Sequence, residues 1–307
     1  MKKTYKKLIL IALLLIIGFS ICYNVVINNR VKVVEQTIEV DNLPEEFEGF
    51  TILQISDLHN KRFGNNQEDL IKIINSLNYD IIGICGDMKN LGEDDNSAFI
   101  DLLKGIENKE NVFYTPGNHG PFVYEDVTEF KSVVFTFKPA KNDKSKLTEE
   151  GKLLQDLGVK FLDEAYSIKR GDKTLWITEL LYLNDLKEIT NNKYKDGDIN
   201  IAITHYPMSK NSYEGNGSER LAQYDLVLAG HYHGGQWRVP FFGAVFIPDL
   251  NQSGLFPSKE RVSGLTTWGG VNQYVTKGLG AGNEIMGLKF RLFNQPEINL
   301  IKLTKRN

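Results

Sequence analysis

The five histidines of this 307-residue chain fall in short polar clusters, each directly after an apolar run. The clusters, with one further cluster that lacks histidine, are Asp57-Leu58-His59, Gly86-Asp87, Gly117-Asn118-His119, Thr204-His205 and Gly230-His231-Tyr232-His233. A lone histidine is most simply a packed or surface side chain, but five in this arrangement favour a shared site. Carboxylates, imidazoles and an amide oxygen, without a thiolate, are suitable ligands for divalent ions such as Mn, Fe, Zn or Co. The clusters therefore predict a metal centre.

The donor side chains are numerous enough for two ions. Seven of these residues can make eight metal bonds if one carboxylate bridges the two ions. Two ions a few ångströms apart can clamp a phosphoryl group, stabilise its attacking and leaving oxygens, and lower the pKa of a shared water. Gly86 and Gly117 stand where we expect the chain to turn sharply and to approach the ions or the substrate closely, which a residue without a Cβ permits.

The apolar runs that precede the clusters are expected to be strands. They cover residues 51–56, 80–85, 112–115, 199–204 and 225–229. A stripe of apolar residues at helical spacing from Leu70 to Leu77, with Asn65 or Asn66 as its cap, predicts a helix, and Phe99 to Ile106 predicts another. Strands that alternate with helices indicate an α/β domain, in which sites gather beyond the carboxyl ends of the strands.

Further elements flank this alternating region. We expect additional strands at residues 33–40, 175–178, 244–247, 274–276 and 298–303. Residues 121–150 have no regular pattern and are interpreted as a loop or insertion, followed by a helix over about 147–157. Trp237, Phe241 and Phe242 could form an apolar wall for a lipid chain, although ordinary packing explains them equally well.

The N-terminal segment has the pattern of a membrane anchor. Four lysines, the last of them Lys7, precede an apolar run from Leu8 to Tyr23 that continues past Asn24 to Ile27. About 20 such residues cross a bilayer as a helix, and the lysines would remain cytoplasmic. A cleaved signal peptide is the alternative, but no small-residue cleavage site follows the run. We expect an anchor over 1–30, a connector with a first strand over 31–50, and a catalytic domain over 51–307.

The overall composition limits the classes of partner and of stabilising bond. The chain has 36 basic and 39 acidic residues and a net charge of -3, without a long basic block in the folded part. This balance disfavours a stable nucleic-acid complex. Cys22 lies in the apolar run and Cys85 in an expected strand, so a disulfide framework is not expected.

The order of the clusters resembles that of the calcineurin-like metallophosphoesterase superfamily. The similarity extends from Leu53 to the C-terminus. The segments 54–59, 230–236, 275–280 and 291–298 resemble in particular a bacterial, membrane-associated phosphodiesterase branch. This resemblance implies a four-layer αββα sandwich with two divalent metal ions, attached here to an N-terminal transmembrane helix.

The resemblance also implies a role for each clustered residue. The first ion would be bound by Asp57, His59 and His233, the second by Asn118, His205 and His231, and both by Asp87. His119 would remain unligated and would face the phosphate, where it would protonate the leaving oxygen or stabilise its charge. A hydroxide that bridges the metals would attack phosphorus in line with the leaving group.

Two positions depart from the pattern of the superfamily. Asn90 stands where an acidic residue is frequent, and Gly120 stands where Asp or Glu usually follows the histidine. Because that acid normally orients the catalytic histidine, its absence puts the proton chemistry of His119 in doubt. Glu125 or Asp126 could replace it from the adjacent loop.

The resulting hypothesis is a phosphoester hydrolase of the phosphodiesterase or pyrophosphatase type. We expect it to be a single-pass protein of the cell membrane, with the catalytic domain outside the cytoplasm and an envelope or lipid-linked phosphate as substrate. One alternative is a phosphomonoesterase that acts as a protein phosphatase. Another is a sensor that keeps the metals without catalysis, which the substitution at Gly120 motivates.

Overall fold

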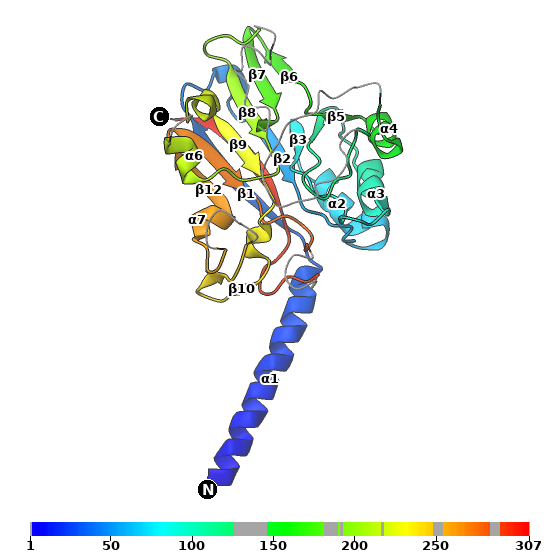
Figure 1. Cartoon of the computed structure of the whole chain (residues 1–307), viewed down its shortest axis with the longest axis vertical. Coiled ribbons are helices and arrows are strands. Elements are labelled where there is room, and N and C mark those ends of the chain that lie inside the picture. The colour runs from blue at the N-terminus through cyan, green and yellow to red at the C-terminus, as the bar shows by residue number, and fades with distance from the viewer. Residues whose placement is uncertain are drawn as a thin grey trace.

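Two six-stranded sheets form the body of the computed structural model, and a long N-terminal helix projects from it (Figure 1). The structure describes residues 2–125, 146–180, 190, 193–215, 218–247, 254–282 and 289–306. The two sheets pack face to face through one cluster of buried apolar residues that receives side chains from both. The predicted α/β class is therefore confirmed.

The first sheet contains three of the strands that were expected before clusters. Its strands, in spatial order, are β1 (Lys32–Val40), β14 (Glu297–Lys305), β2 (Thr51–Ile55), β3 (Ile81–Ile84), β4 (Val112–Tyr114) and β5 (Val159–Phe161). All neighbours are parallel except β14 and β2. Because side chains alternate along a strand, Ile82 and Ile84 face one side of the sheet and Ile81 faces the other, and all three are buried. Burial on both faces explains why β3 is apolar throughout.

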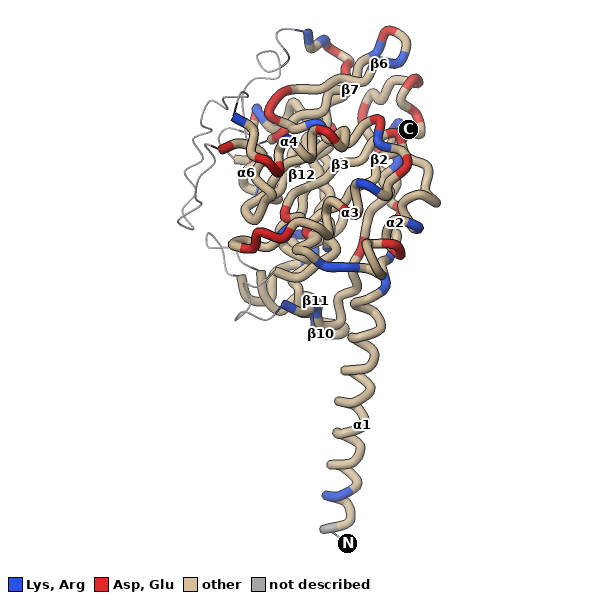
Figure 2. Tube along the Cα trace, turned by 90° about the vertical axis from the view of Figure 1, so that its right-hand side faces the viewer, with Lys and Arg blue, Asp and Glu red and all other residues tan. Residues whose placement is uncertain are grey.

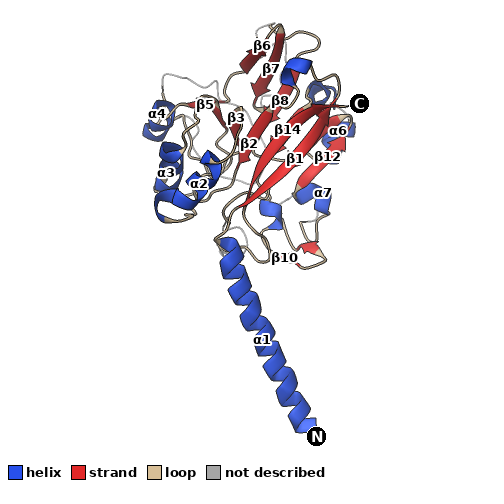
Figure 3. Cartoon of the chain, turned by 180° about the vertical axis from the view of Figure 1, so that it is seen from behind, coloured by secondary structure: helices blue, strands red, loops and turns tan. Residues whose placement is uncertain are grey.

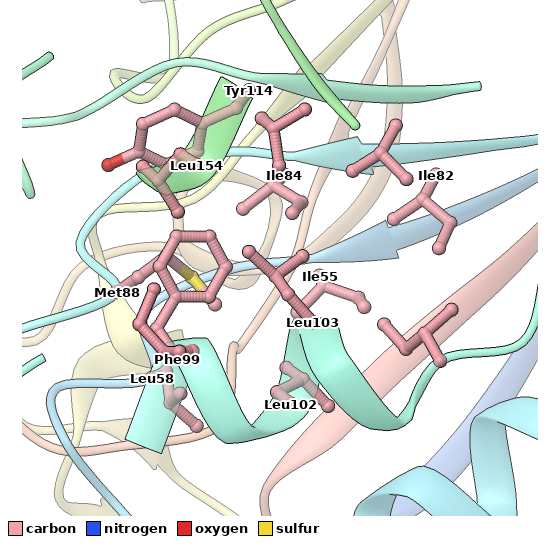
Figure 4. Close-up of a cluster of buried hydrophobic side chains, with 14 of the residues drawn as sticks. Ile55, Leu58, Ile82, Ile84, Met88, Phe99, Leu102, Leu103, Tyr114 and Leu154 are labelled. Atoms are coloured by element: carbon pink, nitrogen blue, oxygen red, sulfur yellow. The ribbon is translucent and has the colours of Figure 1, made fainter. Parts of the chain in front are cut away.

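Three helices cover the outer face of the first sheet. They are α2 (Glu68–Asn75), α3 (Ser97–Gly105) and α4 (Glu149–Asp156). Figure 4 shows Phe99, Leu102 and Leu103 of α3 packed against Ile55, Ile82 and Ile84 of the sheet. These three helical residues recur at the spacing of one helix face, so a single stripe of α3 supplies the contact.

The second sheet contains the strands that precede His205 and His231. Its strands, in spatial order, are β12 (Gly264–Trp268), β13 (Val271–Val275), β9 (Leu226–Ala229), β8 (Ile199–Ile203), β7 (Lys173–Thr178) and β6 (Tyr166–Arg170). Tyr213 of the short helix α6 (Lys210–Glu214) and Leu221 of η4 (Ser218–Gln223) pack on its outer face. Helices, sheet, sheet and helices thus follow one another, as the predicted αββα sandwich requires.

The remaining short elements lie in the connections between strands. They are η1 (Glu45–Phe47), η2 (Asn65–Gln67), η5 (His233–Gly235), the hairpin of β10 (Arg238–Val239) and β11 (Gly243–Ala244), and α7 (Lys259–Val262). The hairpin lies at the end of the body from which the N-terminal helix emerges (Figure 3).

The N-terminal helix α1 (Lys2–Asn28) is long and apolar enough to cross a membrane. Figure 2 shows that its charged residues are confined to the N-terminal end. A signal sequence satisfies the same criteria of length and composition. The helix is therefore a candidate for membrane anchoring or for export.

Some local predictions differ from the structure. Neither Asn65 nor Asn66 caps α2: both lie in η2, and the N-cap is Gln67, whose left-handed backbone separates the two helices. The strand expected over 244–247 is reduced to β11. Strands β5, β6 and β12 were not predicted, and most of the expected loop at 121–150 lies outside the described residues.

Candidate metal centre

The carboxyl ends of five parallel strands converge at one edge of the two sheets. Asp57 and His59 follow β2, Asp87 follows β3, Asn118 and His119 follow β4, His205 follows β8, and His231 and His233 follow β9. The first three strands belong to one sheet and the last two to the other. The sequence placed these residues at strand ends. The structure shows that both sheets of the sandwich contribute these strand ends.

One group of donor atoms consists of Asp57, His59 and His233. Their ligand atoms lie within 4.8 Å of one another, and all three residues are buried. The His59 and His233 rings are 4.8 Å apart, and His233 Nε2 is 3.7 Å from Asp57 Oδ1. Burial raises the pKa of Asp57 to about 7, with a further increase from the negative charge of Asp87, while His205 opposes it. A bound cation would stabilise the charged form of a carboxyl group in this buried, negatively charged environment.

The second group consists of Asp87, His205 and His231, with Asn118 beside them. His205 Nε2 is 3.0 Å from Asn118 Oδ1, 3.1 Å from His231 Nδ1 and 3.1 Å from Asp87 Oδ2. A single hydrogen on Nε2 can satisfy only one of these atoms, whereas one cation can satisfy all of them. Ligands at right angles around a cation, with bonds of about 2.1 Å, are about 3.0 Å apart. The donor set therefore fits a divalent ion.

The other nitrogen of His205 fixes the orientation of the ring. Nδ1 lies 2.7 Å from the backbone oxygen of Cys85 and donates its hydrogen there, which leaves Nε2 directed at the second group. Burial alone would lower the pKa of His205, but the charge and hydrogen bond of Asp87 raise it to about 9. A proton on His205 thus competes with a metal ion for the same acceptors.

Asp87 lies between the two groups. Its Oδ2 is 3.1 Å from His205 Nε2 and 3.7 Å from His59 Nε2, and its Oδ1 accepts a hydrogen bond of 2.8 Å from the backbone N–H of His119. Burial tends to raise the pKa of Asp87, but the three neighbouring histidines, His205 above all, lower it well below its usual range. Asp87 Oδ2 therefore faces both candidate groups.

The backbone at the centre is unusual. Asp57, His59, Asp87, His231 and His233 all have positive φ, between 47° and 72°. A residue with a Cβ in this left-handed region carries a strain of roughly 1 kcal/mol. Such strain is retained where surrounding structure enforces it, and it is concentrated at functional sites. No sequence signal marked these five residues as left-handed.

The predicted requirement for glycine is confirmed at two positions. Gly86 has φ of 88°, and a Cβ there would meet Gly117 and His205 at 2.8 Å. Gly117 has φ of 70°, and a Cβ there would overlap Asp87 Oδ1. Both glycines therefore let the strand ends approach each other around the donor atoms.

His119 lies beside the groups and belongs to neither of them. It is buried, and its ring is 4.8 Å from that of His59. The backbone N–H of Leu91 donates a hydrogen bond of 3.0 Å to His119 Nδ1. Because Nδ1 accepts, the ring hydrogen of neutral His119 is on Nε2. Where the family usually has an acid that accepts from this ring, the structure places a donor. Asp126 lies outside the described residues.

Several further residues hold the ligands in place: the sequence marked Asn90 only as a departure from the superfamily pattern, and it gave Arg291 and Asn294 no role. Asn90 Oδ1 is 3.2 Å from His59 Nδ1, which orients that ring as a carboxylate would. Asn294 Nδ2 and the buried guanidinium of Arg291 donate to the backbone oxygen of His233, over 2.7 and 3.3 Å. The only sequence signal for Arg291 and Asn294 was the resemblance of residues 291–298 to the family, which did not indicate a role.

Two donor groups at the shared edge of an αββα sandwich define a metal-dependent enzyme of the phosphoesterase class. Residues 50–235 match the calcineurin-like phosphoesterase family, and this region is more than half of the chain. The chain therefore belongs to the calcineurin-like phosphoesterases and is a phosphoester hydrolase. Members of this family normally bind two divalent metal ions, in agreement with the two candidate groups.

Several relatives are similar over most of the chain. The metallophosphoesterase YkuE of Bacillus subtilis is 27% identical over 91% of this chain and 87% of its own length. The phosphodiesterase YaeI of Escherichia coli is 28% identical over 83% and 82%. A transmembrane protein with a metallophosphoesterase domain from Danio rerio is 24% identical over 89% of this chain and 57% of its own length.

Proposed function

We propose that this chain is a dinuclear metal-dependent phosphodiesterase of the membrane, acting on an envelope or lipid-linked phosphodiester or pyrophosphate. The observation that carries the proposal is the pair of donor groups joined by Asp87 Oδ2. The similarity to a protein named as a phosphodiesterase supports the reaction type.

In this proposal Asp57, His59 and His233 hold one ion, and His205, His231 and Asn118 hold the other, with Asp87 shared. Two ions so placed supply Lewis-acid activation of the phosphoryl group and of the attacking water. Because the ligands include only two carboxylates, the loaded centre keeps a surplus of positive charge, which attracts an anionic phosphoryl group. His119 presents Nε2–H to an oxygen of the reacting phosphate and stabilises its charge.

The proposed location rests on α1. With Lys6 and Lys7 at its cytoplasmic end, the body at the other end of α1 lies outside the cytoplasm. We retain the division into an anchor over 1–30, a connector with the first strand over 31–50, and a catalytic domain over 51–307. A C-terminal alkaline phosphatase fusion is expected to be active, and an active cytoplasmic reporter in its place would reverse the orientation.

The reaction is tested with the full chain in detergent, supplied separately with Mn, Fe, Zn or Co. We expect faster turnover of bis-p-nitrophenyl phosphate than of p-nitrophenyl phosphate, and loss of this turnover in Asp87→Ala. Asp225→Ala, an aspartate at the opposite end of β9, serves as the control. A preference for the monoester would favour the phosphomonoesterase. Binding of two ions without hydrolysis of either ester would favour the sensor.

A further inference from the structure

A groove of about 760 Å³ separates α1 from the segment 289–292 and extends to His59 of the metal centre. The residues of α1 that line it recur in pairs every four positions, from Ile16 to Asn29. Positions four apart share one helix face. The groove therefore runs along one stripe of the helix, from within its apolar part to the catalytic body.

The stripe contains a run of polar residues in the C-terminal part of α1. Ser20, Asn24 and Asn28 are spaced by four. Polar side chains inside a membrane helix are expensive and are usually functional. Asn24 Oδ1 accepts a hydrogen bond of 2.5 Å from the backbone N–H of Phe293, and Asn28 Nδ2 donates one of 2.8 Å to the Arg291 backbone oxygen. These bonds fix the end of the helix on the catalytic body, so the groove has two defined walls.

The chemistry of the groove changes along its length. Along the turns of α1 from Ile16 to Ile21 its walls are mainly apolar, with Phe290 on the other side, and nearer the centre they include Lys61 and Arg291. Arg291 is 1% exposed, and the hydrogen bonds given by its guanidinium run to backbone oxygens. A molecule with an apolar chain and an anionic phosphate fits this groove, with its chain along the apolar part and its phosphate near the basic side chains.

A second surface places this end of the body against a bilayer. Phe241 and Phe242, at the turn between β10 and β11, are 106% and 84% exposed, and Leu255 and Phe256 are also exposed. Figures 1 and 3 show this hairpin beside the point at which α1 leaves the body. Exposed aromatic residues adjoining a membrane helix are typical of an interfacial contact. The groove mouth therefore opens at the membrane surface.

We propose that the groove admits a membrane phospholipid from the leaflet at the C-terminal end of α1 and brings its phosphodiester to the metal centre. This inference rests on the proposed function and specifies its substrate class. Water oxygen forms the new bond to phosphorus, the bond from phosphorus to one ester oxygen breaks, and that ester oxygen leaves as an alcohol after taking a proton lost by the water. The acyl chains remain along the apolar part of the stripe.

The test uses two adjacent valines. Val25 lines the groove, whereas Val26 is turned about 100° away around the helix, and both are exposed. The full chain is reconstituted in vesicles of phosphatidylcholine and phosphatidylglycerol, and hydrolysis products are followed by mass spectrometry beside turnover of bis-p-nitrophenyl phosphate. We expect Val25→Trp to lower lipid hydrolysis at least tenfold more than turnover of the soluble diester. Val26→Trp should change neither.

The outcomes separate this inference from the proposed function. If the parent chain hydrolyses neither substrate, the proposed function fails. If it hydrolyses the soluble diester but no lipid, or if both valine variants lose lipid hydrolysis equally, the groove proposal alone is wrong. If Val25→Trp converts a dimer to a monomer without affecting lipid hydrolysis, a second copy of the chain occupies the groove instead.

Discussion

The hydrogen bond from Leu91 to His119 predicts how this histidine acts on the substrate. The backbone N–H of Leu91 already points at His119 Nδ1. A doubly protonated ring would carry a second hydrogen on Nδ1, so two hydrogens would lie between the Leu91 nitrogen and Nδ1, which are 3.0 Å apart. The bond therefore disfavours the imidazolium and leaves a neutral ring with Nε2–H. Such a ring is a poor proton donor to an alkoxide but a good hydrogen-bond donor to a phosphoryl oxygen.

Two substitutions of His119 distinguish hydrogen bonding from proton transfer. In His119→Asn the amide oxygen can accept from Leu91, but no donor remains at the position of Nε2. In His119→Gln an amide N–H can take that position. Removing one charge-stabilising donor lowers kcat by roughly 10²- to 10³-fold. We expect that loss for His119→Asn and a loss of about tenfold for His119→Gln, since a donor is retained there.

The assay is a series of aryl phosphodiesters with leaving groups from p-nitrophenol to phenol. If His119 only donates a hydrogen bond, the loss in His119→Gln is about equal across the series. If it transfers a proton, worth roughly 10²- to 10⁴-fold, the loss grows as the leaving group becomes more basic. A tenfold greater loss for phenyl than for p-nitrophenyl esters would refute our reasoning. Leu91→Ala keeps the backbone N–H and should be as active as the parent chain.

Further predictions concern the metals and stability. Asp87→Asn should lower metal affinity by roughly 100-fold, measured by elemental analysis after dialysis, because the shared carboxylate is lost. Gly117→Ala should destabilise the chain by about 1–2 kcal/mol in urea unfolding and reduce metal content, since its Cβ overlaps Asp87. Leu103→Ala, in the core, should destabilise by about 2–5 kcal/mol without changing metal stoichiometry. Burial raises the pKa of Asp225 to about 6, so the stability that its proton contributes is complete below pH about 4 and is lost as the pH rises through 6. Asp225→Asn should therefore gain about 3 kcal/mol at pH 8 and little at pH 4, and equal gains would exclude this cause.

Strands buried on both faces could be predicted from the sequence, whereas three of the four edge strands of the two described sheets, β5, β6 and β12, could not. The run Ile81–Ile84 is continuously apolar because helices cover one face of β3 and the second sheet covers the other. Strand β6, at the edge of the second sheet, alternates exposed and half-buried residues and ends in Lys169 and Arg170. Among the described residues β6 pairs only with β7, at the edge of the sheet. Its side chains are not fully buried, so its sequence contains no continuous apolar run from which a strand could be predicted.

The residues of the candidate centre could be selected from the sequence because their types and order are distinctive. Their surroundings could not, because they depend on backbone groups. The donor to His119 is a main-chain N–H, so the identity of Leu91 carries no signal. In the same way, Cys85 orients His205 through its carbonyl oxygen, which every residue has. The departure at Gly120 drew attention to His119 without revealing what contacts it.

One segment, residues 289–294, connects the N-terminal helix α1 to the first donor group. At one end, Lys289 pairs with Glu93, whose carboxylate accepts from the Asn90 amide, and Asn90 in turn contacts His59. This chain of contacts extends from the rim of the groove to a candidate metal ligand.

At the other end of this segment, Arg291 and Asn294 hold the backbone of His233, while Phe293 bonds to Asn24 of α1. Both histidines of the first group thus depend on a segment that also forms the groove wall. The second group depends on the sheets, since His205 is held by Cys85 at the end of β3. The segment 289–294 therefore contacts both α1 and the first donor group.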